Sequence, residues 1–351
     1  MAGVTRSWKT VLAVAAAAVA TVVGADALLH AVAPLKPLVE VEDAVATYRD
    51  GDPTVLVLGS SHARTFLVVG EELARRTGGA ERIVAVPVEM GKLTSYEWVL
   101  DHRLHPLMDE RDASGRLVRP GLRRVIIVTE WWDSADPEDI LTRSNIPARA
   151  WQIGDFLADA RVNGLTPYNR NYVAYRWLRL TRESTLTQDR GHDGIVNGLK
   201  ALVRPPDPAA LRADRERRLE GWRSMVERGA TIELADPQMA AFDRILEDLR
   251  QRGLEVTVLL YPRMPATLSE TARQTTVKRF SDRMEVLARE RGFRLADAST
   301  FPLITDDDFE DDFDHITADG NRKFTAWALD NGFSFLMRPL PAPASPAGGA
   351  P

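Results

Sequence analysis

Three residues with complementary chemistry lie in two short segments near opposite ends of the chain. Ser61 follows an apolar run, 54–58, and Asp312 stands three residues before His315. A serine hydroxyl attacks an electrophile at neutral pH only when a neighbouring imidazole takes its proton, and the imidazole needs a carboxylate that fixes its tautomer. The sequence therefore supplies a candidate nucleophile, Ser61, a candidate base, His315, and a candidate orienting carboxylate, Asp312.

Each segment also has a simpler interpretation. Small residues after a strand often make only a tight turn, and Ser60 or Ser61 can be the N-cap of the next helix. The acidic run 306–314 can be a solvated loop. Hard cations favour carboxylate oxygens, but the spacing of this run lacks the alternation of a calcium loop. We therefore expect no metal site and no cofactor.

A parallel sheet covered by helices on both faces would position these residues. Five segments rich in Val, Ile and Leu have the composition of buried parallel strands, and amphipathic segments separate them. We expect strands at 54–58, 82–88, 123–131, 255–261 and 293–298, and helices at 62–76, 94–108, 237–252, 269–291 and 318–331. The predicted fold is α/β, a three-layer sandwich with a central parallel sheet of about five strands. Ser61 would then lie at the carboxyl edge of the sheet, where chemistry collects in open α/β folds.

The predicted domain boundaries follow from where this alternation holds. We expect a membrane anchor or signal segment at 1–34, a linker with a short helix at 35–53, an α/β domain at 54–335 and a disordered Pro/Ala-rich tail at 336–351. The segment 133–235 is rich in Arg and Trp and contains no convincing strand. We expect it to be a mostly helical insertion at the edge of the sheet, above the candidate site.

The composition excludes several classes of function. The 351-residue chain has a net charge of -5 and no basic cluster interleaved with aromatic residues, which argues against a nucleic-acid partner. It contains no cysteine, so disulfides, thiolate metal sites and cysteine nucleophiles are excluded.

The N-terminus predicts a location. Arg6 and Lys9 precede a largely apolar run, 10–25, which reaches the length of a membrane span if Asp26 lies near the far interface. This arrangement predicts a single-pass cell-membrane protein with an extracytoplasmic catalytic domain. A cleaved signal peptide, which predicts a secreted protein, and a soluble Ala-rich helix are the alternatives.

Taken together, the two segments resemble the motifs of the SGNH (GDSL-like) hydrolases, and the resemblance covers roughly residues 50–335. In that family the nucleophilic serine follows the first strand in a Gly-Asp-Ser block, where this chain has Gly59-Ser60-Ser61. A late Asp-x-x-His block, followed by a helix, supplies the orienting residue and the base, and Asp312 and His315 match it. The resemblance implies an acyl-serine intermediate on Ser61.

The middle blocks of the family depart further from this sequence. The resemblance implies an oxyanion hole built from the backbone N–H groups of Ser61 and Gly91. The family's Asn-containing third block is missing, and Glu130 occupies its expected place. An ionised carboxylate only accepts hydrogen bonds, so Glu130 cannot replace the asparagine as a donor unless it is protonated.

A membrane-tethered subgroup resembles the chain better than free esterases do. It comprises the SGNH-like proteins of alginate O-acetylation and teichoic-acid D-alanylation, which carry an N-terminal membrane segment, Gly-Ser-Ser and a degenerate third block. This resemblance implies O-acyl transfer or O-acyl ester hydrolysis on a cell-envelope glycan or polymer, with a membrane-bound O-acyltransferase as partner. The alternative is a non-catalytic scaffold of the same fold that binds polysaccharide or docks such an acyltransferase.

Several further residues are candidates for a substrate cleft at the third strand and in the insertion. They are Glu130, Trp131, Trp132, Asn169 and Arg170. Exposed indoles can stack on sugars, although aromatic residues more often anchor a core. His62, directly after the candidate nucleophile, is expected to face solvent at the start of a helix.

Overall fold

The structure is a computed structural model that describes residues 36–88, 91–134, 153–163, 208–229, 234 and 236–337, with parts of 10–24. The chain forms two compact units. One comprises Met1–Glu42 and Pro137–Ala213, and the other comprises Asp43–Asp136 and Asp214–Pro351. The second unit contains the sheet, Ser61, Asp312 and His315, so the predicted site belongs to one unit.

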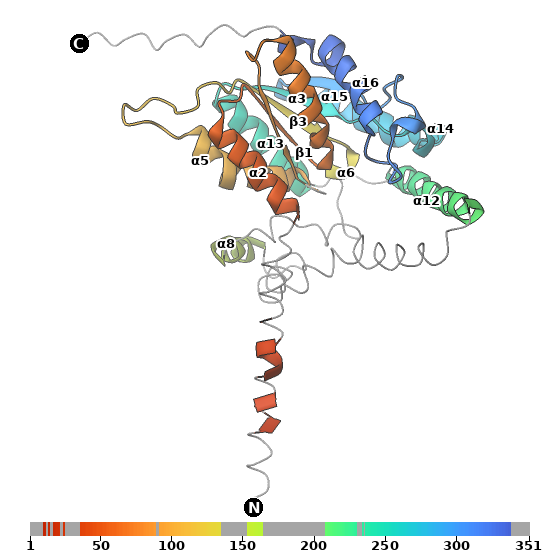
Figure 1. Cartoon of the computed structure of the whole chain (residues 1–351), viewed down its shortest axis with the longest axis horizontal. Helices are drawn as coiled ribbons and strands as arrows, with labels where there is room; N and C mark the ends of the chain where they lie inside the picture. Colours follow the sequence, from red (N-terminus) through yellow and green to blue (C-terminus); the bar gives the residue numbers. More distant parts are fainter. Residues whose placement is uncertain are drawn as a thin grey trace, which may run out of the picture. The chain divides into compact units, whose positions relative to one another are not determined.

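A five-stranded, all-parallel sheet forms the centre of this unit, which confirms the predicted fold class (Figure 1). The strands are β1 (Val55–Gly59), β2 (Ile83–Pro87), β3 (Arg124–Thr129), β4 (Glu255–Leu260) and β5 (Arg294–Asp297). Their order is β2-β1-β3-β4-β5, the order of flavodoxin-like doubly wound sheets. β1 therefore lies between β2 and β3, and the strand order reverses at its end.

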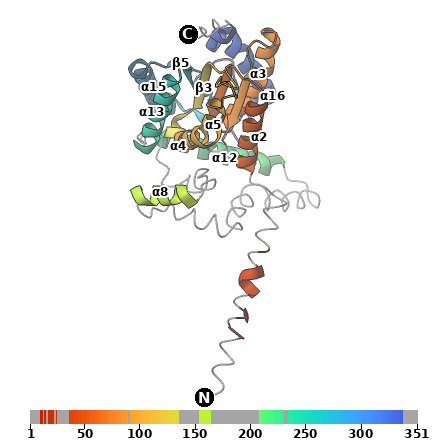
Figure 2. The same cartoon turned by 90° about the vertical axis from the view of Figure 1, so that its left-hand side faces the viewer.

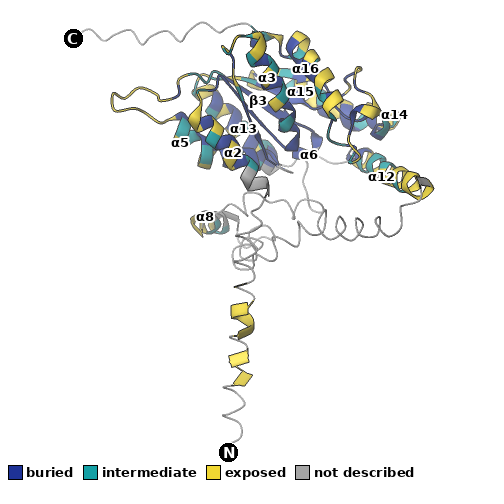
Figure 3. Ribbon diagram, in the orientation of Figure 1, coloured by how far each residue is buried: buried dark blue, intermediate teal, exposed yellow. Residues whose placement is uncertain are grey.

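Helices cover both faces of the sheet, as Figures 1 and 2 show. Since side chains alternate along a strand, Val55 and Val57 face one layer, where they join a core cluster with Phe66 of α3 (Thr65–Arg76) and Phe324 of α16 (Ala318–Trp327). On the other face, α13 (Asp236–Gln251) packs on β4 and on α4 (Leu93–Val99). The strands β1 to β4 are buried over most of their length, whereas β5, at the edge of the sheet, is mostly not (Figure 3).

The remaining helical elements complete the described part of the chain. They are α2 (Lys36–Asp50), η1 (Ser61–Arg64), η2 (Leu100–Leu104), α5 (His105–Met108), α6 (Trp131–Ser134), α8 (Ile153–Asn163), α12 (Pro208–Arg228), η5 (Pro265–Thr267), α14 (Glu270–Ala272), η6 (Arg273–Val277), α15 (Lys278–Arg291), η7 (Asp306–Asp308), η8 (Ala328–Gly332) and η9 (Ser334–Met337). The predicted helices 94–108, 269–291 and 318–331 each contain a π-helical stretch. These stretches are η2, η6 and η8, which follow directly after α4, α14 and α16.

Several predicted boundaries differ from the structure. The segment 35–53, expected as a linker with a short helix, is mostly the 15-residue helix α2, in which Val45 and Tyr48 are buried. The expected insertion 133–235 extends too far, because its last part, from Asp214, belongs to the unit of the sheet. The tail begins later than 336, since Leu336 is fully buried in the core. Local composition could not reveal these packing contacts.

The third strand is also shorter than the predicted 123–131. β3 ends at Thr129, and α6 starts at Trp131. A turn at Glu130 joins the two elements. It is stabilised by the Asp133 Oδ2, which accepts a hydrogen bond from the Glu130 N–H at 3.1 Å.

Within the described residues, no helix has both the length and the apolar composition that crossing a membrane requires. Most of the segment 1–34 lies outside these residues. The membrane anchor and its alternatives therefore stay predictions.

Candidate active site

The carboxyl ends of the strands bring together side chains that lie far apart in the sequence. Ser60 and Ser61 follow β1, Glu130 follows β3, and Arg263 follows β4. Gly59 allows the close approach of β1 to β3, because a Cβ at this position would lie 2.8 Å from the Val128 Cβ. The switch in strand order therefore creates the edge on which the candidate site is built.

Ser61, His315 and Asp312 form a continuous hydrogen-bonded chain. The Ser61 Oγ lies 2.6 Å from the His315 Nε2, and the His315 Nδ1 lies 2.8 Å from the Asp312 Oδ2. A carboxylate only accepts hydrogen bonds, so Nδ1 carries the proton and Nε2 is free to accept the Ser61 proton. The predicted geometry, serine on one ring nitrogen and aspartate on the other, is confirmed.

The loop that carries Asp312 and His315 is reinforced by its own backbone. The Asp312 Oδ1 accepts hydrogen bonds from the N–H groups of Asp314, at 3.1 Å, and His315, at 3.0 Å. Between them, Phe313 is buried and has a φ of 65°, a left-handed conformation that is uncommon for a residue other than glycine. This turn fixes the Asp312 carboxylate and the His315 ring relative to each other.

The surroundings of the triad favour a basic imidazole beside an ionised carboxylate. Burial alone would lower the pKa of His315, but its hydrogen bond to Asp312 and the charge of Asp314 raise the pKa above 6.5. Burial would likewise raise the pKa of Asp312, but the hydrogen bonds from His315 and Asp314 hold it below 3.8. The imidazolium formed when His315 takes a proton is thereby stabilised.

A second group of the same residue types lies directly beside the first. The His62 Nδ1 is 3.1 Å from the Ser60 Oγ, and its Nε2 is 3.2 Å from the Asp314 Oδ2. The prediction that His62 faces solvent is wrong, because its side chain is only 2% exposed. Its ring stacks on Tyr261, with centroids 4.0 Å apart, and lies 5.3 Å from the His315 ring.

His62 is buried because η1 turns its side chain inward, toward residues of β4 and of the late loop. Burial lowers its pKa below 6.5, although the nearby Asp314 acts in the opposite direction. Ser60 occupies the N-cap position of η1, but its hydroxyl contacts His62 and makes no capping hydrogen bond. Sequence reasoning missed this group because no motif pairs His62 with Asp314, as the serine and Asp-x-x-His blocks pair Ser61 with His315.

A buried arginine compensates the acidic side chains of the site. Arg263 pairs with the Glu130 carboxylate, and its Nη1 lies 3.7 Å from the Asp314 Oδ1. Glu130, a predicted cleft residue, is therefore buried in an ion pair. The sequence offered no signal for Arg263, since a lone arginine after a strand is common.

The predicted oxyanion hole is only partly supported by the structure. The Gly91 N–H donates to the Val88 carbonyl at 2.7 Å, so it is not aimed at a substrate and the prediction for Gly91 is wrong in this conformation. The glycine serves a tight turn, because a Cβ here would lie 2.7 Å from the same carbonyl oxygen. The Ser61 N–H lies in the first residue of η1, and its part of the prediction is untested.

The predicted aromatic platform is not formed by Trp131. Its side chain is buried. The Arg263 guanidinium carbon lies over the Trp131 ring, 6.0 Å from the ring centroid. Trp132 belongs to α6, but its side chain is not among the described ones. Asn169 and Arg170 lie outside the described residues.

Asp133 is a further buried acid at this edge that sequence reasoning did not single out as a site residue. Burial raises its pKa from 3.8 to about 8, although Thr129, Lys92 and Tyr96 act against the shift. Burial therefore favours the neutral form of this carboxyl group, and a neutral carboxyl can donate a hydrogen bond.

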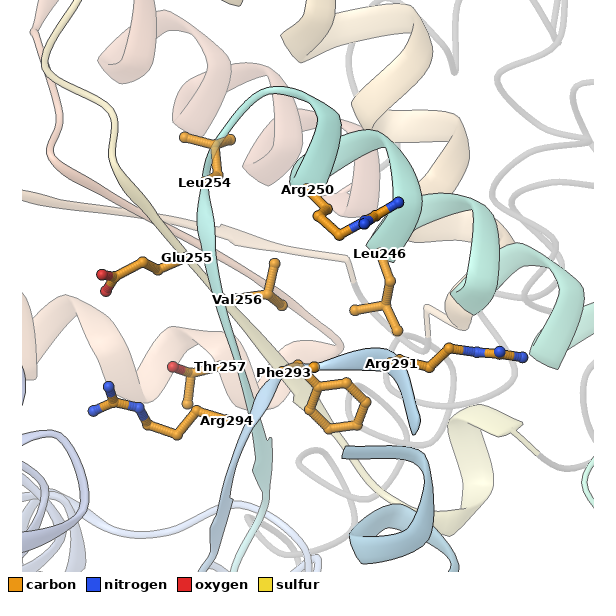
Figure 4. Close-up of a pocket in the computed structure, with 10 residues that line it drawn as sticks. Leu246, Arg250, Leu254, Glu255, Val256, Thr257, Arg291, Phe293 and Arg294 are labelled. Carbon is orange, nitrogen blue, oxygen red and sulfur yellow. The ribbon is translucent and has the colours of Figure 1, made fainter. Parts of the chain in front are cut away.

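A cavity of about 370 Å³ lies elsewhere in the same unit, at the opposite end of the sheet (Figure 4). Its lining includes Glu255 and Arg294, the first residues of β4 and β5, together with Leu246 of α13. Because the candidate triad lies at the carboxyl ends of the strands, this cavity is separate from it.

Comparison with known proteins yields no relative. No family model matches the chain, and no match is found among the curated proteins or the solved structures. The resemblance to SGNH hydrolases rests on the motifs described above.

Proposed function

We propose that the chain is a serine-dependent O-acyltransferase or O-acyl esterase that acts through an acyl-serine intermediate. The observation that carries this proposal is the chain of short hydrogen bonds from Ser61 through His315 to Asp312. Its second support is exposure: the side chains of His315 and Asp312 are 31% and 38% exposed, so a substrate has access to the base.

The arrangement supports a two-step reaction. His315 Nε2 takes the Ser61 proton as Oγ bonds to the acyl carbonyl carbon, and the Ser61 N–H is the backbone group we assign to the oxyanion. The intermediate collapses when the bond to the leaving oxygen breaks, and this oxygen receives the proton from His315. In the second step an acceptor hydroxyl or water gives its proton to His315 as its oxygen bonds to the acyl carbon. The bond from the acyl carbon to the Ser61 Oγ then breaks, and Oγ takes the proton back from His315.

The substrate and location follow from the sequence resemblance. We infer a cell-envelope glycan or polymer as substrate, an extracytoplasmic site on a single membrane span, and a membrane-bound O-acyltransferase as partner. The buried Glu130–Arg263 pair, in place of the family's asparagine, is compatible with a site that differs from that of free esterases.

The test uses a fluorophosphonate probe, which reacts with activated serines, on the full chain. We expect labelling of the wild type and none of Ser61→Ala, with the adduct located by peptide mass spectrometry. Ser60→Ala is the matched control, because Ser60 contacts His62 and not His315. Equal labelling of Ser61→Ala and wild type would contradict the proposal.

One observation favours a non-catalytic scaffold as the second candidate. The Gly91 N–H is already engaged with Val88, so one of the two predicted oxyanion donors is missing. A correctly folded wild type that does not react with the probe or with small acyl esters would support this alternative.

A further inference from the structure

His62, Asp314 and His315 form a cluster that the proposed acyl transfer does not use as a whole. Each offers one ligand atom, and these atoms all lie within 4.8 Å of one another. The His62 Nε2 is buried, and the Asp314 Oδ2 lies 3.2 Å from it without the geometry of a regular hydrogen bond. A buried imidazole nitrogen this close to a carboxylate requires a proton or a cation between them.

We propose that His62, Asp314 and His315 bind one divalent transition-metal ion of the zinc class, and that this ion holds the serine in an unreactive state. Two imidazoles and one carboxylate are a donor set that suits Zn²⁺ and excludes a preference for Ca²⁺ or Mg²⁺. The 3.2 Å between the His62 Nε2 and the Asp314 Oδ2 is close to the separation of two ligands, each about 2.0–2.2 Å from one zinc ion.

The outer contacts of both histidines fit this role. A metal-binding imidazole usually has its second nitrogen held by a polar group, which fixes the ring. Here Ser60 contacts the His62 Nδ1, at 3.1 Å, and Asp312 contacts the His315 Nδ1, at 2.8 Å. The His62 Nε2 is left beside Asp314, at 3.2 Å, and the His315 Nε2 is left on the side of Ser61.

The cluster also has a route for an ion. The His62 side chain is 2% exposed and closes one side, whereas those of Asp314 and His315 are 22% and 31% exposed. An ion would enter past the two accessible ligands and reach the buried one last.

Binding of the metal and activation of Ser61 compete for one lone pair. The His315 Nε2 contacts the Ser61 Oγ at 2.6 Å and is the atom that takes its proton. When the same nitrogen binds a metal ion it cannot accept that proton, so Ser61 loses its base. This regulatory consequence rests on the proposed serine chemistry, whereas the metal site itself does not.

The first measurement is therefore direct binding. The full chain, purified without a histidine tag and stripped with a chelator, is titrated with ZnCl₂ in a calorimeter. We expect one saturable site per chain whose affinity falls by at least about tenfold in His62→Gln, since a ligand is lost. His102→Gln is the matched control, because this histidine contacts the Trp98 carbonyl and stacks on the Trp98 ring. Absence of binding, or equal affinity of His62→Gln and wild type, would overturn the site.

The second measurement is the rate of fluorophosphonate labelling of Ser61 with and without ZnCl₂. We expect zinc to slow labelling at least about tenfold in the wild type and His102→Gln, and far less in His62→Gln. Zinc that binds without slowing the wild type would overturn the inhibitory role. Zinc binding that depends on His62 in a chain that never reacts with the probe would support the metal site and contradict the proposed function, so the two failures are distinguishable.

Discussion

Two groups of serine, histidine and aspartate lie side by side in this molecule, and their environments differ. Ser61, His315 and Asp312 are linked by contacts of 2.6 and 2.8 Å, whereas the contacts among Ser60, His62 and Asp314 are 3.1 and 3.2 Å. The His315 side chain is 31% exposed and that of His62 is 2% exposed.

The same difference separates the acid–base properties of the two imidazoles. Burial lowers the pKa of His62, while the hydrogen bond to Asp312 and the charge of Asp314 outweigh the effect of burial at His315 and raise its pKa. Residue type alone therefore does not distinguish a base from a buried polar group. Access to substrate and the carboxylate geometry make that distinction.

The sharpest test of this contrast is removal of each histidine. We expect His315→Ala to lower the turnover of a small acyl ester by as much as about 10⁶-fold, because Ser61 loses its base. His62→Gln should lower it far less. Turnover is measured with chelator present, and circular dichroism checks that both variants are folded. Equal losses in the two variants would remove the distinction between the groups.

The second test compares the two aspartates of the same loop. Asp312→Asn should lower turnover by as much as about 10⁴-fold, because an amide can hold the wrong tautomer of His315. Asp314→Asn leaves the His315–Asp312 hydrogen bond intact and should have a smaller effect. A larger loss for Asp314→Asn, measured with the same ester, would assign the orienting role to Asp314.

The third test measures how much the buried Glu130–Arg263 ion pair contributes to the stability of the fold. Arg263→Met leaves the buried Glu130 carboxylate without its partner, and we expect a loss of about 3–5 kcal/mol in the free energy of unfolding. Arg322→Met is the control, since the Arg322–Asp319 pair is 69% exposed on both sides and its loss should not be measurable. The free energies of unfolding of the two variants are measured with urea. Equal values would contradict a stabilising role of the buried Glu130–Arg263 pair.

The last test concerns a pH dependence due to Asp133, whose effect within any one pH unit is smaller than the losses above. Its pKa is about 8 in the folded chain, against an ordinary value of 3.8, so between these values the folded state keeps a proton that the unfolded state releases. The free energy of unfolding should therefore fall as pH rises through this window, by no more than about 1.4 kcal/mol per pH unit. Asp133→Asn has no such proton and should reduce the slope in urea unfolding over the same pH range. An unchanged slope would contradict the raised pKa.

Much of the architecture was predictable because its signals are local. The five apolar runs and the helical periodicity between them anticipated β1 to β5, α3, α13 and α16 to within a few residues. The glycine and serines after β1 and the Asp-x-x-His spacing likewise brought Ser61, Asp312 and His315 together as candidates. These predictions depended on the order of residue types along the chain.

Other features were not predictable because they depend on neighbours remote in sequence. The turn at Gly91 uses its N–H, α2 buries residues expected in a linker, and Trp131 packs inward under Arg263. Sequence patterns cannot report whether a given polar atom is already paired or covered.

The sequence by itself thus determined the parallel sheet and singled out Ser61, His315 and Asp312 as candidates, since strand composition and motif spacing are written along the chain. Only the tertiary structure decided that His62 is buried against Asp314 and that Glu130 is paired with Arg263. The physical reason is that burial and pairing are properties of atoms brought together by folding, here from the segments that follow β1, β3 and β4 and from the loop before α16.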